Sequence, residues 1–259
     1  MIVVLIRIYY SLVALVFTII TGFTWPLILL LQTSTFTREL YYSYILGVIC
    51  KLVTKSVGPI KMKMFDDMHK YCEELAPPES DKVIKVLEIG PGVGDNFKFY
   101  KSPVQLTTID HNVFLKETAD KLAIDYPLVN VVDSKLGNAE NMTCFEDNTF
   151  DIVLGTLIMC CVNDNNAVLS EIHRVLKPNG RYYYFEGNRM QPTRSQIMRS
   201  LEYVLSYVWR CCEFGCKFLH NNFDQKLKSS KLVTQWNVIY APPECPLNHE
   251  IHYGCAMKI

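Results

Sequence analysis

The chain has 259 residues, which is enough for one domain with a full core and an appended segment. Its 26 basic and 26 acidic residues give no net charge, so no overall field attracts a polyanion, and we do not expect nucleic acid as a partner. The ten cysteines include adjacent pairs such as Cys160 and Cys161 but no C-x-x-C spacing. This pattern favours reduced thiols over disulfides and predicts no metal site.

The N-terminal segment is strongly apolar. No charged side chain occurs from residue 8 to residue 37, and the run from Ile8 through Leu31 is rich in Leu, Ile, Val and aromatic residues. As a helix, ~30 residues would reach about 45 Å, which exceeds the roughly 30 Å hydrocarbon core of a bilayer. We therefore predict a membrane anchor over residues 1–37 that binds membrane lipid. A cleaved signal peptide, with an apolar part of only about 7–15 residues, is the alternative.

Two features bear on the geometry of this anchor. Trp25-Pro26 can break a helix, because proline lacks an amide donor and clashes with the preceding turn, so a hairpin within one leaflet is an alternative to a span. Arg7 alone precedes the apolar run, whereas several basic residues follow it. By the positive-inside bias, the chain after the anchor faces the cytosol.

The rest of the chain divides into a connecting segment and one α/β domain. Residues 38–79 are predicted to form amphipathic linker helices, chiefly between Tyr41 and Tyr71, and Pro77-Pro78 then interrupts the helical pattern. Residues 80–259 alternate apolar runs with helical patterns, which is typical of a parallel sheet with crossover helices. We predict a seven-stranded, doubly wound, Rossmann-like sheet.

The expected strands are Val83–Ile89, Gln105–Asp110, Val129–Val132, Phe150–Thr156, Arg181–Glu186, Leu232–Tyr240 and Ile251–Lys258. The expected helices are Asp95–Tyr100, Val113–Asp125, one that Asp164 caps and Pro178-Asn179-Gly180 stops, and Thr193–Cys212. The apolar face of the last helix either packs in the core or forms a lid over an apolar substrate pocket.

A glycine-rich turn follows the first expected strand. Gly90, Gly92 and Gly94 let the backbone approach a ligand, and an electropositive helix N-terminus lies behind them. Wound sheets bind nucleotide-like ligands at this carboxyl end. The dinucleotide fingerprint requires glycine at position 95, where Asp95 stands, and a negative charge there disfavours a diphosphate. Glu88 suits a ligand that carries an ammonium and a sulfonium better than one that carries phosphates.

Polar side chains also follow the second and third expected strands. Asp110 lies 20 residues after Gly90, where a carboxylate can accept hydrogen bonds from both hydroxyls of a ribose. Its alternative role is a helix N-cap, since Asp110-His111-Asn112 precedes a helix. In Gly137-Asn138-Ala139-Glu140, a short polar side chain and a backbone amide can read an adenine edge. A plain surface turn explains this tetrapeptide nearly as well.

Four motifs, in order, resemble those of the class I S-adenosylmethionine (SAM) dependent methyltransferases. They are the glycine turn, Gly137-Asn138-Ala139-Glu140, Phe150-Asp151-Ile152-Val153 and the run from Glu171 to Gly180, and the resemblance covers residues 80–186. The resemblance implies SAM as the cofactor, and it implies the following cofactor-binding residues: Glu88, Gly90, Gly92, Gly94, Asp110, His111, Asn138, Ala139 and Thr156. The family usually has Asp where Asn138 stands, and an amide is the weaker acceptor for an adenine amino group.

A narrower resemblance rests on the run from Gly94 to Tyr100, on Gly155-Thr156-Leu157 with Cys160-Cys161-Val162, and on Tyr184-Phe185-Glu186. Together with the apolar N-terminus, these are similar to the membrane-bound thiol S-methyltransferases of the methyltransferase-like 7 group. This resemblance implies a small lipophilic thiol as the acceptor. It also implies an endoplasmic reticulum or lipid-droplet membrane as the location, with the catalytic domain facing the cytosol. Gly187 departs from the group, which tends to have His there.

The sequence leaves the acceptor chemistry open. A thiol with a pKa of about 8.5 is already a few per cent thiolate at neutral pH, so a catalytic base is not obligatory and we assign none. Tyr184, Glu186 and His220 are candidates by position alone. Methylation of oxygen, nitrogen or carbon on a lipid or quinone would use the same cofactor site. A membrane-resident adaptor without turnover is a third reading, which the glycines and Asp110 disfavour. No obligate protein partner is evident.

Overall fold

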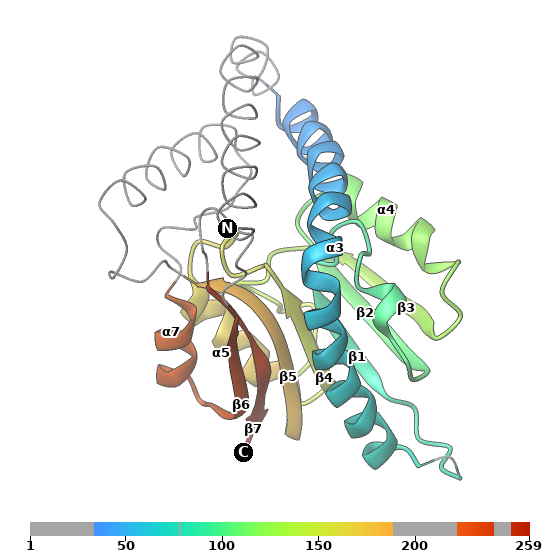
Figure 1. Ribbon diagram of the computed structural model, residues 1–259, viewed down its shortest axis with the longest axis vertical. Helices are drawn as coiled ribbons and strands as arrows, with labels where there is room; N and C mark the ends of the chain where they lie inside the picture. The colour runs from blue at the N-terminus through green and yellow to red at the C-terminus, as the bar shows by residue number, and fades with distance from the viewer. Residues whose placement is uncertain (1–33, 78, 189–221, 241–249) are drawn as a thin grey trace, which may run out of the picture.

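A computed structural model of the chain describes residues 34–77, 79–188, 222–240 and 250–259 (Figure 1). In this part of the chain, seven strands form one sheet in the order β3-β2-β1-β4-β5-β7-β6. Strands β1 to β5 pair in parallel, and β7 runs antiparallel to both β5 and β6. The predicted seven-stranded, Rossmann-like sheet is confirmed.

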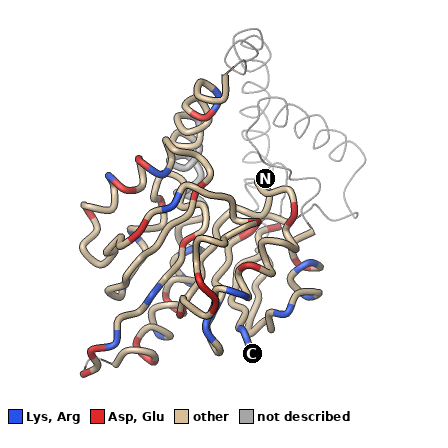
Figure 2. The backbone as a smooth tube through the Cα atoms, turned by 180° about the vertical axis from the view of Figure 1, so that it is seen from behind, with Lys and Arg blue, Asp and Glu red and all other residues tan. Residues whose placement is uncertain are grey.

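The strands are β1 (Lys85–Ile89), β2 (Val104–Asp110), β3 (Val129–Leu136), β4 (Phe150–Thr156), β5 (Leu176–Asn188), β6 (Leu232–Tyr240) and β7 (Glu250–Lys258). The helices are α3 (Thr35–Leu75), the 3-10 turn η1 (Phe97–Phe99), α4 (Val113–Ala123), α5 (Asn165–Val175) and α7 (Phe223–Ser229). Basic and acidic residues are interspersed along the domain, in keeping with the balanced charge (Figure 2).

Each face of the sheet carries its own apolar core. Side chains of α3, η1 and α4 belong to the core on one face, and those of α5 and α7 belong to the core on the other. Figure 1 shows these helices around the sheet. Strand β5 supplies both cores, because alternate side chains of a strand point to opposite faces. Tyr183 and Phe185 lie in the first core, whereas Tyr182 and Tyr184 lie in the second, and all four are fully buried.

The segment predicted as linker helices is not a separate linker. Most of residues 38–79 lies in the single helix α3, and Met64, Phe65 and Met68 of this helix are buried in the same core as the strands. Apolar residues at spacings of three and four place one side of a helix against the sheet. The C-terminal half of α3 therefore belongs to the core of the domain.

The remaining differences from the predicted elements have local causes. The helix predicted over Asp95–Tyr100 is only the 3-10 turn η1. β3 extends to Leu136 because its parallel pairing with β2 continues as far as Asp110. α5 ends at Val175, and Pro178-Asn179-Gly180 lies within β5, where Asn179 adopts a left-handed φ of 63°. Helix α7 was not predicted.

The predicted anchor over residues 1–37 lies almost wholly outside the described residues, as do the predicted helix Thr193–Cys212 and His220. Of the helices within the described ranges, none combines the length and the apolar character needed to cross a bilayer. The anchor, whether a span or a hairpin, remains a prediction.

Candidate active site

The carboxyl ends of the first three strands meet at the glycine turn. The Gly90 N–H donates to the Ile109 carbonyl over 2.8 Å, and the Gly137 N–H donates to the Asp110 carbonyl over 2.8 Å. These bonds tie β1 to β2 and β2 to the turn after β3. The glycine turn, Asp110 and Gly137-Asn138 are therefore neighbours at one edge of the sheet, where wound sheets bind their ligands.

The glycine turn has a backbone that only glycine adopts easily. Gly90 and Gly94 have φ values of 61° and 80°. A Cβ on Gly90 would lie 2.8 Å from Cγ2 of Ile158, and one on Gly94 would lie 2.8 Å from the Phe97 ring. The turn therefore presents bare backbone at the edge of the sheet, which is the surface that a nucleoside-like ligand requires.

Glu88 is the centre of a buried hydrogen-bond network. Its Oε1 accepts from Asn96 Nδ2 over 2.8 Å, and its Oε2 accepts from the Tyr100 hydroxyl over 3.1 Å. Asn96 Nδ2 also donates to Thr156 Oγ1 over 2.9 Å, and Lys61 Nζ donates to Asn96 Oδ1 over 3.0 Å. The network joins the glycine turn to the end of β4 and to α3, so it holds these three elements together at this edge of the sheet.

Asp110 is free of the helix-capping role that its position allowed. Asn112 caps α4 instead, since its Oδ1 accepts from the N–H groups of Phe114 and Leu115. Asp110 Oδ1 accepts from the Asn112 N–H over 2.9 Å, and its Oδ2 lies 3.4 Å from the Gly92 nitrogen. Oδ2 thus makes only one long hydrogen bond in the described residues and can accept from a ribose.

Burial dominates the electrostatics of both carboxyl groups. It raises the pKa of Glu88, an effect that the hydrogen bonds from Asn96 and Tyr100 oppose. Burial also raises the pKa of Asp110, against the N–H of Asn112 and the nearby His111. Acidic groups in a site of low dielectric favour a cationic ligand over a phosphate. This environment fits an adenosyl sulfonium.

The other predicted cofactor residues, His111, Asn138 and Ala139, lie at the same edge of the sheet and differ in exposure and hydrogen bonding. The side chain of His111 is 66% exposed, and its Nδ1 lies 3.6 Å from Asp110 Oδ1. Asn138 is also exposed, and its amide bonds to Glu140 through both its oxygen and its nitrogen. This arrangement matches the surface-turn alternative for the side chain of Asn138. Ala139 packs against the second core.

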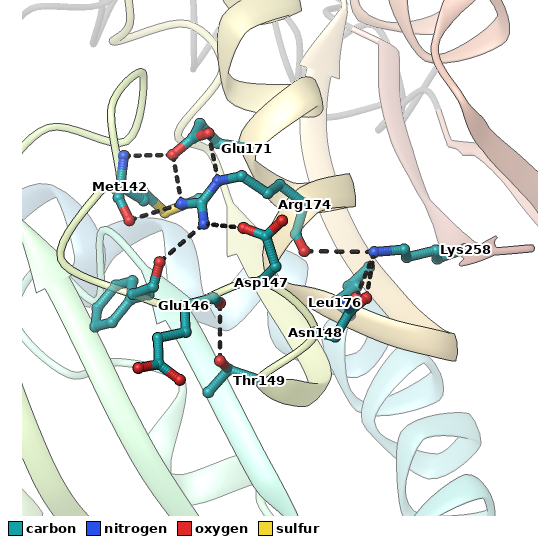
Figure 3. Close-up of polar contacts among 10 residues, drawn as sticks. Met142, Glu146, Asp147, Asn148, Thr149, Glu171, Arg174, Leu176 and Lys258 are labelled. Atoms are coloured by element: carbon teal, nitrogen blue, oxygen red, sulfur yellow. Dashed lines mark hydrogen bonds and ion pairs between the residues drawn. The ribbon is translucent and has the colours of Figure 1, made fainter.

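Arg174 anchors the loop between β3 and β4, which carries Asn138-Ala139 (Figure 3). Its guanidinium donates to Glu171 through two nitrogens and to Asp147 Oδ1, each over 2.8 or 2.9 Å. It also donates to the carbonyls of Met142 and Phe145, both over 2.8 Å. All five N–H donors of the side chain are therefore used. Glu171 in turn accepts from the Met142 N–H, so α5 clamps the loop.

Glu186, one of the candidates for a catalytic base, instead anchors the loop after β4. Its two carboxylate oxygens accept from the N–H groups of Ile158 and Met159, each over 3.1 Å. Burial raises the pKa of Glu186 to about 8, although these two hydrogen bonds oppose the shift. Tyr184 lies between strands, where its hydroxyl contacts Trp236 and Asn237. Neither residue shows the geometry of a dedicated base.

Position 187, where the related group tends to have His, has room for a side chain. Among the described atoms, none lies within 4 Å of the place that a Cβ on Gly187 would take. In the described part of the chain, no three His, Cys, Asp or Glu side chains are grouped to hold a metal ion.

Comparison with known proteins agrees with this geometry. Residues 87–184 match the family model described as a methyltransferase domain. The chain carries a class I SAM-dependent methyltransferase domain. The match begins within β1 and ends within β5, so this methyltransferase domain includes the glycine turn, Asp110 and the loop that Arg174 clamps. The predicted family and cofactor are confirmed.

Individual relatives extend the likeness over more of the chain. The chain is 26% identical over 218 residues to the human thiol S-methyltransferase TMT1A. The match covers 84% of this chain and 86% of TMT1A. The chain is also 35% identical over 130 residues to the ubiquinone/menaquinone biosynthesis C-methyltransferase UbiE of Shewanella sp. (strain W3-18-1). That match covers 48% of this chain and 49% of UbiE. The structure of a geranyl diphosphate methyltransferase in complex with SAM superposes with a TM-score of 0.53 at 14% identity. The superposition covers 68% of this chain and 79% of that one. At that identity the likeness shows the fold alone.

Sequence reasoning missed three members of the methyltransferase site. Asn96 and Tyr100 belong to a motif on which the resemblance rests. Their polar side chains, close in sequence to Glu88, could have been predicted to bind its carboxylate, but they were not. Lys61 gave no signal, because it lies 27 residues before Glu88 on a helix whose place against the sheet is a tertiary property.

Proposed function

We propose that the chain transfers the methyl group of SAM to a small lipophilic thiol at a membrane. The observation that carries the proposal is the pair of buried carboxyl groups, Glu88 and Asp110, on either side of a bare glycine turn. The likeness to a human thiol S-methyltransferase over 84% of the chain supports a thiol as the acceptor.

Bound SAM supplies an electrophilic methyl group on a sulfonium, which is transferred by in-line displacement. The residues of the chain bind and orient the reactants. Asp110 Oδ2 accepts from the ribose, and Glu88, buried behind the glycine turn, fixes Asn96 and Tyr100 through its two oxygens. Asn96 fixes both Glu88 and Thr156, and so sets the distance between the glycine turn and the end of β4. A thiol that is partly ionised in water needs orientation and desolvation more than a base.

The N-terminal half of α3 supports the membrane part of the proposal. Phe36, Leu40, Tyr44 and Val48 recur every fourth residue and are 62%, 46%, 71% and 42% exposed. Residues at this spacing form one stripe on a helix, and an exposed apolar stripe is typical of a contact with lipid or protein. The same helix reaches the cofactor crevice, since Asn112 Nδ2 donates to the backbone carbonyl of Glu39.

Methylation of a quinone carbon is the second candidate. The 35% identity to UbiE favours it, although that likeness covers about half of the chain. The two candidates share the cofactor site and differ in the acceptor. An adaptor without turnover is the least supported reading, because the glycine turn, Glu88 and Asp110 form an intact crevice.

A methyl-transfer assay tests the acceptor. We expect the full-length protein in detergent, supplied with labelled SAM, to methylate lipophilic thiols at sulfur and to leave matched alcohols and quinols unlabelled. The Asp110→Asn variant is the control for methylation that does not depend on the site. Label that appears on carbon or oxygen, and on no thiol, would favour the quinone alternative and contradict the thiol proposal.

Photo-crosslinking tests the membrane surface. We expect the full chain, mixed with phosphatidylcholine vesicles that contain a diazirine-labelled phospholipid, to float with the vesicles and to be crosslinked around Phe36, Leu40 and Tyr44. Ile124 is the internal control, because it is 83% exposed but lies outside the stripe. Peptide mass spectrometry locates the adducts. A chain that stays in the soluble fraction, or adducts equally frequent at Ile124, would exclude this surface as the membrane contact.

A further inference from the structure

A polar cluster with two buried members lies at the carboxyl end of β5, on the face that α5 and α7 cover. Three strands and a helix contribute its members: Asn188, Asp224, Asn237, Glu250 and His252. Asn188 and His252 are 8% and 3% exposed. Burial of these two side chains is costly unless each of their polar atoms finds a partner.

His252 is held as a neutral ring between two amides. Its Nε2 lies 3.2 Å from Asn188 Nδ2, and its Nδ1 lies 3.4 Å from Asn237 Nδ2. Burial lowers the pKa of His252, against the nearby Asp224 and Glu250 carboxylates. A neutral imidazole has one donor and one acceptor nitrogen. In the tautomer with its proton on Nδ1, His252 accepts at Nε2 from Asn188 Nδ2.

Asn188 keeps one group unsatisfied. Its Nδ2 is shared between His252 and Asp224 Oδ1, the latter over 3.3 Å. Its Oδ1 is fully buried and has no hydrogen-bond partner among the residues that the structure describes. A buried acceptor without a donor is rare in folded proteins. Because Asp224 and Glu250 surround the position with negative charge, the missing partner is an N–H or O–H donor.

The cluster lies at the carboxyl end of β5, next to that of β4, with Asn188 facing α7 and Thr156 facing the side of α3. Phe185 pairs in register with Thr156, whose hydroxyl is bound by Asn96 of the glycine turn. Asn188 lies three residues farther along β5, which corresponds to roughly 10 Å. Glu186, between them, holds the loop after β4. A ligand of several bonds can thus reach from the end of β4 to Asn188.

We propose that Asn188 Oδ1 accepts a hydrogen bond from a hydroxyl or amine of the methyl acceptor, several bonds away from the atom that is methylated. The inference rests on the proposed function and narrows its substrate class to thiols with a second, polar end. His252 and Asp224 act as positioning residues, because they fix the amide of Asn188.

Matched thiols test this subsite in the full-length protein. We expect kcat/KM for mercaptohexanol and aminohexanethiol to exceed that for hexanethiol by about tenfold, as one satisfied buried acceptor allows. Asn188→Leu should abolish this preference. Asn166→Leu, at an exposed position of α5, is the matched control and should keep the preference.

Binding of the S-methylated products, measured by calorimetry with S-adenosylhomocysteine present, separates the two proposals. Tighter binding of the hydroxylated product in the absence of any thiol methylation would refute the thiol proposal alone. Equal kcat/KM and equal affinity for polar and apolar chains would refute the subsite. If Asn188→Leu does not fold, Asn188→Asp replaces it. Its carboxylate should favour the amine over the hydroxyl, and an unchanged ratio would also overturn the subsite.

Discussion

Asp110→Asn is expected to weaken SAM binding by about 10- to 100-fold, since an ionised acceptor for two hydroxyls becomes an amide that offers one oxygen. That oxygen is already engaged by the Asn112 N–H, so the Nδ2 group would face the ribose. Isothermal titration with S-adenosylhomocysteine measures the change. Asp125→Asn, the same substitution at an exposed position at the end of α4, should leave the affinity unaltered.

The affinity should also depend on pH with a definite sign. Because burial raises the pKa of Asp110, the ionised form that the ribose requires is lost at a higher pH than for an exposed aspartate. Affinity should therefore fall as the pH decreases through this raised pKa, and Asp110→Asn should lack that part of the pH dependence. An Asn variant with wild-type affinity would mean that the ribose is held elsewhere.

Arg174→Lys is expected to lower the free energy of unfolding by about 2–4 kcal/mol, although the charge is kept. All five guanidinium N–H groups are bound, two of them by backbone carbonyls of the loop after β3. A lysine has three donors on one nitrogen and cannot reach all of these acceptors. Thermal and urea unfolding measure the loss.

Arg181→Lys is the matched comparison for Arg174. Within the described ranges, the Arg181 guanidinium donates only to Tyr183, over 3.4 Å, pairs with Glu74 at 3.7 Å and stacks on the Tyr71 ring. In the described part of the chain, its buried Nε has no hydrogen-bond partner. The loss should therefore be smaller than for Arg174→Lys. Equal losses in the two variants would show that the clamp on the loop adds no stability.

Local patterns determined much of the fold and part of the site. The buried strand that runs into Gly90, Gly92 and Gly94 predicted the turn correctly, since left-handed backbone leaves few residue types to choose from. Phe150–Thr156 and Leu232–Tyr240 were predicted with the bounds that the structure shows. Asp110 could be placed because the carboxyl ends of neighbouring parallel strands fall at one edge of a sheet.

Contacts between segments distant in sequence could be known only from the tertiary structure. Asn112 took the cap of α4 and left Asp110 available, and the sequence Asp110-His111-Asn112 allowed either assignment. Lys61 reaches Asn96 because α3 crosses the face of the sheet, and Asn188 meets His252 because β7 returns beside β5. Spacing along a chain reports which face a residue occupies within its own element. It carries no information about which distant element packs on that face, because packing depends on the shapes and volumes of all the side chains together.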